Sequence, residues 1–225
     1  MKKGKCILMC AGEYHPCAIK KAPDDFVIAV DGGLKYLMKD GPEPDFLLGD
    51  FDSAPPECDA LIETYRKKGD RHFLRLPVEK DETDTLAAVK LGYEMGYREF
   101  EIYGGMGKRL DHTMANIQVL VWLSKRGAGG WLLDGETSVT VIGPGMFFLP
   151  ESFAGTVSLF ALEEELFDVS IRGLKYNLSH ATIRNDFPIG CSNETTENRS
   201  EKAAITIGRG TGLLILTKDL INRHH

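Results

Sequence analysis

The sequence predicts an α/β domain with a Rossmann-like, mostly parallel sheet flanked by helices, followed by an all-β sandwich domain. Two observations lead to this expectation. In the first part of the chain, short apolar runs alternate with helical patterns. Beyond Trp131, short β-prone runs follow one another without a long helical pattern. We place the boundary at residue 135, which gives an α/β domain over 1–135 and a β-sandwich domain over 136–225.

Continuous apolar stretches that end in Gly or Asp mark the strands of the first domain, because strands buried on both faces of a sheet lack polar alternation. These stretches are CILMCA (6–11), FVIAVD (26–31), DFLLGD (45–50) and FEIYGG (100–105). Helical patterns are expected over 33–39, 56–68, 81–95 and 113–126. Alternating strands and helices predict a parallel sheet, and such sheets bind ligands at the carboxyl ends of their strands.

The second domain is predicted from short β-prone runs that are separated by Gly, Pro and polar turns. The runs are SVTVIG, GMFFLP, TVSLFAL, DVSIRG, KAAITIG and GLLILT. The polar segment SNETTENRSE (192–201) is expected to form a hairpin loop. This pattern is typical of an antiparallel sandwich or barrel.

Composition and net charge limit the kinds of partner that this chain can bind. The 225 residues are 43% hydrophobic and 27% charged, which is typical of a folded globular chain. A net charge of -6 without Lys/Arg clusters argues against nucleic acid as the partner, because that binding neutralises phosphates. No apolar run approaches the roughly 18 residues that a membrane span requires. We therefore expect neither nucleic acid nor a membrane as partner.

Cysteine usage predicts a reduced, cytoplasmic protein, because the five cysteines are scattered and form no C-x-x-C pair. Cys6, Cys10 and Cys17 with His15 could suggest zinc. This alternative is weak, because Cys6 and Cys10 fall in a predicted strand, where free cysteine is a small core residue. The terminal pair, His224 and His225, resembles the stub of a purification tag.

Acidic and glycine-rich segments lie at the predicted strand ends and helix starts. They are VDGG (30–33), GDFDS (49–53), DETDT (81–85) and YGGMGKRLDH (103–112). Each has a structural alternative: Asp31 before two glycines fits a turn, and Asp81 with Asp84 fits a helix N-cap and an acidic first turn. Capping does not explain why so many aspartates gather at one sheet edge. Crowded carboxylates predict Mg²⁺, which prefers oxygen ligands and usually binds substrate phosphates as well.

The segment GGMGKRLDH predicts the phosphate side of such a site. Its glycines let the backbone approach a phosphate closely, and the guanidinium of Arg109 matches phosphate oxygens. The segment is not a Walker A loop, because Arg109 follows Gly107-Lys108 in place of Ser or Thr. It does not fit G-x-G-x-x-G either, because Leu110 occupies the last position. The spacing therefore matches neither of these nucleotide-binding motifs.

The ordered motifs DGG, PDFLLGDFDS, DETDT, GGMGKRLDH, GLKYNL and GCSNE resemble the thiamine pyrophosphokinase family over almost the whole chain. The resemblance implies an α/β domain followed by a β-sandwich domain for thiamine binding and dimerisation. It also implies a homodimer with active sites between subunits. The implied reaction transfers a pyrophosphoryl group from ATP to thiamine and gives thiamine diphosphate and AMP.

The resemblance also implies residue roles. Asp50, Asp52 and Asp84 match the family's Mg²⁺-ATP carboxylates, and Arg109 and Asp111 match its residues beside the phosphates and the thiamine hydroxyl. The catalytic set is then Asp52, Asp84, Arg109 and Asp111. Nucleotide binding falls to Asp31, Gly32, Gly33, Gly104, Gly105, Lys108 and Arg109, and thiamine binding to Tyr176, Ser192 and Asn193. Met106 and Lys108 are larger than in many relatives, and Tyr176 replaces the Trp of animal members.

Alternatives remain open at this point. A π face such as Tyr176 suits the cationic thiazolium of thiamine, but the same ring could simply pack in the sandwich. Ser192 and Asn193 could be ordinary turn residues. The aspartates would also serve a Mg²⁺-dependent phosphohydrolase, and a non-catalytic thiamine or nucleotide sensor would need fewer of them.

Overall fold

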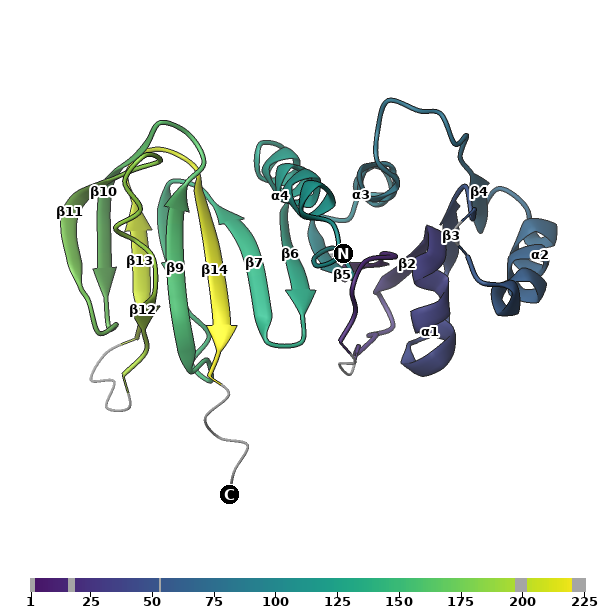
Figure 1. Ribbon diagram of the computed structural model, residues 1–225, viewed down its shortest axis with the longest axis horizontal. Helices are drawn as coiled ribbons and strands as arrows, with labels where there is room; N and C mark the ends of the chain where they lie inside the picture. Colours follow the sequence, from purple (N-terminus) through teal and green to yellow (C-terminus); the bar gives the residue numbers. More distant parts are fainter. Residues whose placement is uncertain (1–2, 16–18, 53, 197–201, 220–225) are drawn as a thin grey trace, which may run out of the picture. The chain divides into compact units, whose positions relative to one another are not determined.

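The computed structural model describes residues 3–15, 19–52, 54–196 and 202–219. The chain divides into two compact units, Met1–Gly135 and Glu136–His225. Figure 1 labels the helices and strands of both units. Among the described residues, no helix is both long and apolar enough to cross a membrane.

The first unit contains a parallel sheet. Its strands are β1 (Cys6–Met9), β2 (Phe26–Val30), β3 (Phe46–Gly49), β4 (Phe73–Arg75), β5 (Glu99–Tyr103) and β6 (Gly129–Asp134). They are arranged in the order β6-β5-β1-β2-β3-β4, and every neighbouring pair is parallel. The predicted Rossmann-like α/β fold is confirmed. Sequence analysis missed β4 and β6, because β4 has only three residues and β6 opens with two glycines.

Helices cover both faces of this sheet (Figure 1). They are the short 3₁₀ turns η1 (Asp31–Gly33) and η2 (Pro56–Cys58) and the helices α1 (Leu34–Asp40), α2 (Asp59–Lys68), α3 (Asp84–Glu94) and α4 (Leu110–Ser124). Leu37 of α1 and Tyr65 of α2 pack in one core cluster with Ile7 of β1. Gly92 of α3 lies against Cys6, the neighbour of Ile7, whose side chain points to the opposite face.

The strand order places a topological switch point between β1 and β5. From β1 the chain proceeds outward through β2 and β3 to β4, and then returns to β5 and β6 on the other side of β1. Loops that leave the carboxyl ends of β1 and β5 therefore turn in opposite directions and open a crevice. Open α/β sheets bind their ligands in such a crevice.

The second unit is an antiparallel sandwich. Its strands are β7 (Thr137–Ile142), β8 (Gly145–Phe148), β9 (Gly155–Ala161), β10 (Glu165–Arg172), β11 (Leu178–Arg184), β12 (Asn193–Glu194), β13 (Ala204–Ile207) and β14 (Gly212–Lys218). One layer has the order β12-β9-β14-β7, and the other has the order β11-β10-β13-β8. The two layers face each other, because Gly212 of β14 lies against Leu166 of β10 and Ile207 of β13. The predicted β-sandwich is confirmed.

One local expectation in the second unit is wrong. Asn193 and Glu194 form β12 and pair with Val157 and Thr156 of β9, although the segment 192–201 was expected to be a hairpin loop. Its polar composition hid a strand of only two residues. Residues 197–201 lie outside the described part of the chain, as do Cys17, His224 and His225.

Candidate active site

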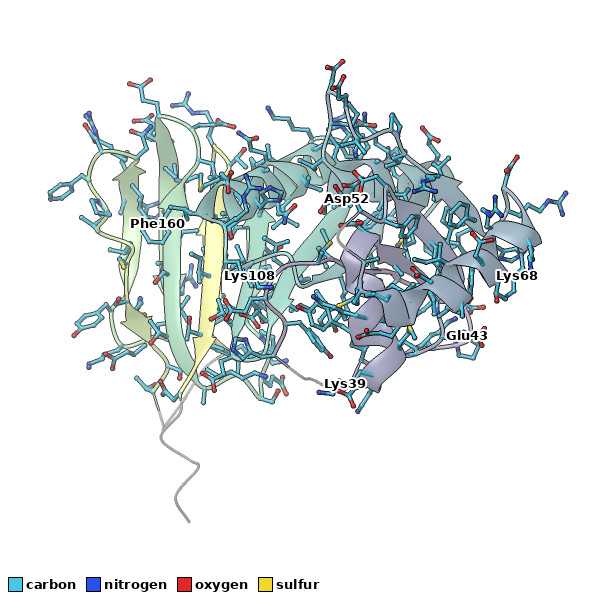
Figure 2. The ribbon with its side chains drawn as sticks, turned by 45° about the vertical axis from the view of Figure 1, so that its right-hand side comes forward. Lys39, Glu43, Asp52, Lys68, Lys108 and Phe160 are labelled. Atoms are coloured by element: carbon cyan, nitrogen blue, oxygen red, sulfur yellow. The ribbon has the colours of Figure 1, made fainter. Side chains whose placement is uncertain are left out.

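A cleft of about 580 Å³ lies at the switch point of the first unit, within the usual size range of small-molecule sites. Backbone from the ends of β1 and β5 lines it through Gly12, Gly104 and Gly105. Asp52 and Lys108, which are labelled in Figure 2, also line the cleft. Of the predicted site residues, this lining includes Asp31, Asp50, Asp52, Asp84, Gly104, Gly105, Lys108 and Arg109.

Three carboxylates converge in this cleft. One oxygen from each of Asp31, Asp50 and Asp52 lies within 4.8 Å of the other two. Asp31 follows β2 and Asp50 follows β3, so the parallel register brings them to the same sheet edge. Among the residues that the structure describes, no other set of three His, Cys, Asp or Glu side chains converges in this way. Cys6 and Cys10 are instead buried, so the described residues do not favour the zinc alternative.

Glycine at position 49 allows this convergence. Gly49 has a φ of +152°, and a Cβ there would lie 2.8 Å from Cα of Asp31 and 2.9 Å from its amide nitrogen. Only a residue without a side chain lets the end of β3 approach the end of β2 so closely. The neighbouring residues are also held in left-handed backbone, with a φ of 49° at Asp31 and 62° at Phe51. Such strained residues cluster at functional sites.

Asp50 has an amide and an ammonium beside its carboxylate. Its Oδ1 accepts a hydrogen bond from the amide of Asp52 at 3.2 Å, and Lys80 lies 3.5 Å from its Oδ2. Burial alone would raise the pKa of Asp50, but the Asp52 amide and the Lys80 ammonium outweigh it and lower the pKa. Asp50 is therefore charged at neutral pH.

Asp84 is at the first position of α3, and Lys80 lies 3.1 Å from its Oδ1. Burial raises the pKa of Asp84, and the nearby Asp50 and Asp31 charges add to this effect, while Lys80 opposes it. The helix is not capped by Asp81, as the structural alternative assumed. The Thr83 hydroxyl accepts the hydrogen bond from the Leu86 amide at 3.2 Å.

The glycine-rich loop after β5 forms another wall. The Gly12 amide donates to the Gly104 carbonyl at 2.9 Å, and a Cβ at Gly104 would lie 2.3 Å from the Cys10 carbonyl oxygen. The loop is also anchored from α4, because the buried Asn116 side chain donates to the Gly105 carbonyl at 2.7 Å. The glycines that were predicted to let the backbone approach a ligand are therefore also needed for packing, because Gly104 lies directly against the end of β1.

Arg109 and Asp111 lie at the rim. The Arg109 guanidinium donates two hydrogen bonds to Asp111, at 3.1 and 2.6 Å, and both side chains are well exposed. The guanidinium lowers the pKa of Asp111, and the His112 amide adds to this effect. Asp111, Gly32 and Gly33 are not among the residues that line the cleft. Gly33 instead packs on the end of β1, where a Cβ would lie 2.1 Å from the Met9 carbonyl oxygen.

The predicted thiamine residues are in the second unit. The Asn193 side chain accepts from the Tyr176 amide at 3.0 Å and donates to the Tyr176 carbonyl at 2.6 Å. Asn193 is buried, while Tyr176 is 58% exposed, with the Lys175 ammonium 5.4 Å from the centre of its ring. Ser192 has a φ of 60°, and its amide donates to the Ser158 hydroxyl. These contacts hold Tyr176 beside Ser192 and Asn193 and leave its ring accessible.

Sequence analysis missed several residues of the cleft. Lys80 is the clearest omission, because its partner Asp50 is thirty residues away in the chain and no motif links them. Asn116 lies in a helix interior, where only its polarity in an otherwise apolar stripe could have drawn notice. Gly12 directly follows the apolar run 6–11, and this position after a predicted strand could have indicated a ligand loop.

The donor set fits a hard divalent cation. Its atoms are carboxylate oxygens, which Mg²⁺ prefers, and the cleft leaves space beside them for phosphate groups. An acidic cluster and a glycine-lined loop at the switch point of a parallel sheet together define an enzyme of the phosphoryl-transfer class.

Comparison with known proteins narrows this class. The chain matches the family model described as "Thiamin pyrophosphokinase, catalytic domain" over residues 20–129 and the model "Thiamin pyrophosphokinase, vitamin B1 binding domain" over residues 148–211. These matches together cover more than half of the chain. It therefore belongs to the thiamine pyrophosphokinase family.

Individual relatives agree with this assignment. The thiamine pyrophosphokinase of Bacillus subtilis is 27% identical over 195 residues, which cover 85% of this chain and 86% of the relative. Its crystal structure superimposes with a TM-score of 0.84 at 24% identity and covers 96% of this chain and all of that one. The thiamin pyrophosphokinase from Candida albicans superimposes with a TM-score of 0.71 at 15% identity, over 96% of this chain and 90% of that one. At these identities the two structures establish the fold.

Proposed function

We propose that this chain is a Mg²⁺-dependent thiamine pyrophosphokinase that transfers a pyrophosphoryl group from ATP to the hydroxyl of thiamine. The products are thiamine diphosphate and AMP. The observation that carries this proposal is the convergence of Asp31, Asp50 and Asp52 beside the glycine-rich loop, in a chain whose two parts match the two domain models of that family.

The roles in the cleft follow from its chemistry. Asp50 and Asp52 would hold the Mg²⁺ ion, and Asp31, which converges with them, would supply a third carboxylate. Bound Mg²⁺ neutralises charge on the triphosphate. Asp84, which was also predicted as a ligand, lies in the same cleft with its Oδ1 3.1 Å from the Lys80 ammonium. Gly104 and Gly105 let the backbone approach the phosphates, and Lys108 and Arg109 supply positive charge at the rim.

The reaction forms one P–O bond and breaks another. The thiamine hydroxyl oxygen attacks the β-phosphorus of ATP, and the bond from this phosphorus to the oxygen bridging α and β breaks, so AMP leaves with that oxygen. Asp111 orients the hydroxyl and accepts its proton. Its carboxylate is a weak base beside Arg109, but the transition state of phosphoryl transfer is loose. Positioning and electrostatics therefore contribute more than base strength.

Tyr176, Ser192 and Asn193 are proposed to bind thiamine, with the Tyr176 ring against the thiazolium. The contacts of Asn193 with the Tyr176 backbone support this role, because they hold the backbone of Tyr176 next to Asn193. We propose that the protein acts in the cytoplasm, as its cysteine usage predicts, and forms a homodimer with active sites between subunits, as the family resemblance implies. Light scattering coupled to size-exclusion chromatography tests the dimer: a mass near 50 kDa is expected from a 24.9 kDa chain, and 25 kDa would contradict it.

Product analysis tests the function. The protein is incubated with ATP and Mg²⁺, with and without thiamine, and nucleotides and thiamine phosphates are separated by chromatography. We expect AMP and thiamine diphosphate in equal amounts, formed only when thiamine is present. A phosphohydrolase would release phosphate or nucleotide without thiamine, and a sensor would bind without turnover. Either result would contradict the proposal.

A further inference from the structure

Lys80 is a fixed positive charge inside the acidic cleft. Its ammonium is 3.1 Å from Oδ1 of Asp84, 3.5 Å from Oδ2 of Asp50 and 3.0 Å from the Pro77 carbonyl. The contact with Pro77 is a hydrogen bond, and the contacts with Asp84 and Asp50 are ion pairs. The side chain is only 14% exposed, and Asp50 is 12% exposed. The Lys80 ammonium is therefore held inside the cleft and is largely shielded from solvent.

This charge bears on metal binding. The Asp50 carboxylate has one oxygen paired with Lys80 and also belongs to the converging set with Asp31 and Asp52. A divalent ion bound by these three carboxylates would lie on the other side of the Asp50 carboxylate from the Lys80 ammonium. The two positive charges repel each other, so the ammonium weakens the binding of a free divalent ion. A polyphosphate brings negative charge that satisfies both the ion and the ammonium. With the polyphosphate present, the Lys80 ammonium no longer weakens binding of the divalent ion.

We propose that Lys80 is a positioning residue that makes the carboxylate cluster selective for a divalent ion bound together with a polyphosphate over the free ion. The inference rests on the proposed metal site and deepens it. Lys80 lowers the affinity for free metal and couples metal binding to nucleotide binding. Coupling of this kind is reciprocal, so each ligand raises the affinity for the other by the same factor.

The test measures binding of Mn²⁺ by electron paramagnetic resonance, with and without α,β-methylene-ATP, which cannot donate its pyrophosphoryl group. In K80M, we expect free Mn²⁺ to bind about tenfold more tightly than in the unaltered protein, and the coupling factor between metal and nucleotide to fall about tenfold. A structural role would give the opposite sign, because Asp50 would lose its support and Mn²⁺ would bind more weakly. Unchanged or weaker Mn²⁺ binding in K80M overturns the proposal.

Matched variants isolate the cause. K80R keeps the charge and should retain weak free-metal binding and strong coupling. Lys5 is also an ion-paired lysine, 2.6 Å from Glu101, but it precedes β1 at the amino end of the sheet, so K5M should leave Mn²⁺ binding unchanged. An equal effect in K5M and K80M overturns the proposal. K80Q serves as the neutral variant if thermal unfolding shows that K80M is not folded.

The product assay on the unaltered protein separates the two proposals. Absence of thiamine-dependent AMP would refute the proposed reaction, while the comparison of Mn²⁺ binding between K80M and the unaltered protein would still decide the role of Lys80.

Discussion

Replacing Gly49 by alanine should damage the metal site through one steric contact. The added Cβ would lie 2.8 Å from Cα of Asp31, whereas non-bonded carbons are in favourable contact at about 3.5–4.0 Å. Asp31 and Gly49 must therefore separate by roughly 0.7 Å or more. Metal–ligand distances in a well-formed site lie within about 0.2 Å of their usual values, so a shift of this size disturbs the coordination. We expect the affinity for Mn²⁺ to fall about 10–100-fold, as it does when the support of a metal ligand is lost.

The same substitution should also destabilise the fold. An L-residue at a φ of +152° is strained, and such strain costs about 1–3 kcal/mol of the free energy of unfolding. The assay pairs Mn²⁺ titration with urea denaturation of G49A. Gly69 provides the control, because its φ is +82° but a Cβ there meets nothing within 4 Å. G69A should lose about 1–2 kcal/mol of stability and keep its Mn²⁺ affinity.

The comparison of the two alanine variants can refute this reasoning. If G49A binds Mn²⁺ as tightly as G69A while both lose similar stability, the close approach of β3 to Asp31 does not position the metal ligands.

Three further predictions concern the same unit. D52N and D84N should each lower turnover about a hundredfold, the usual effect of losing one preorganised electrostatic contact, and a near-normal rate of D52N at limiting Mg²⁺ would contradict the metal assignment. R109K keeps the charge but loses the planar fork, so turnover should fall at least about tenfold; a rate equal to that of the unaltered enzyme would show that charge alone suffices. Burial raises the pKa of the Cys10 thiol from 9.0 to about 12, so the folded state favours the neutral thiol. The stability that this provides is present below pH 9 and is lost as the pH rises from 9 toward 12, and urea denaturation across this range should show a shallower decline for C10A.

Much of the fold could be predicted because a strand that is buried on both faces of a sheet has a continuous apolar sequence. The runs at 6–11 and 26–31 are apolar throughout, and β1 and β2 lie within them. The three-residue strand β4 has two exposed residues and gives no such signal. Helix α4 begins at Leu110, three residues before the predicted start, because its first turn is polar.

The site could be predicted in part for a similar reason. Asp31 and Asp50 come directly after apolar strands, and parallel strands bring their carboxyl ends to one edge. Sequence patterns do not specify which of the aspartates at this edge bring their carboxylate oxygens together. That depends on the approach of Gly49 to Asp31 and on Lys80, which pairs with Asp84 through a local turn and with Asp50 through tertiary structure.

Diffraction from crystals grown with Mn²⁺ and α,β-methylene-ATP tests the central claim most directly, because anomalous scattering locates the ion without assumptions about the protein. We predict an ion at about 2.1 Å from carboxylate oxygens of Asp31, Asp50 or Asp52, with phosphate oxygens completing its coordination. An ion bound only to other residues, or nucleotide density away from the glycine-rich loop, would contradict the account.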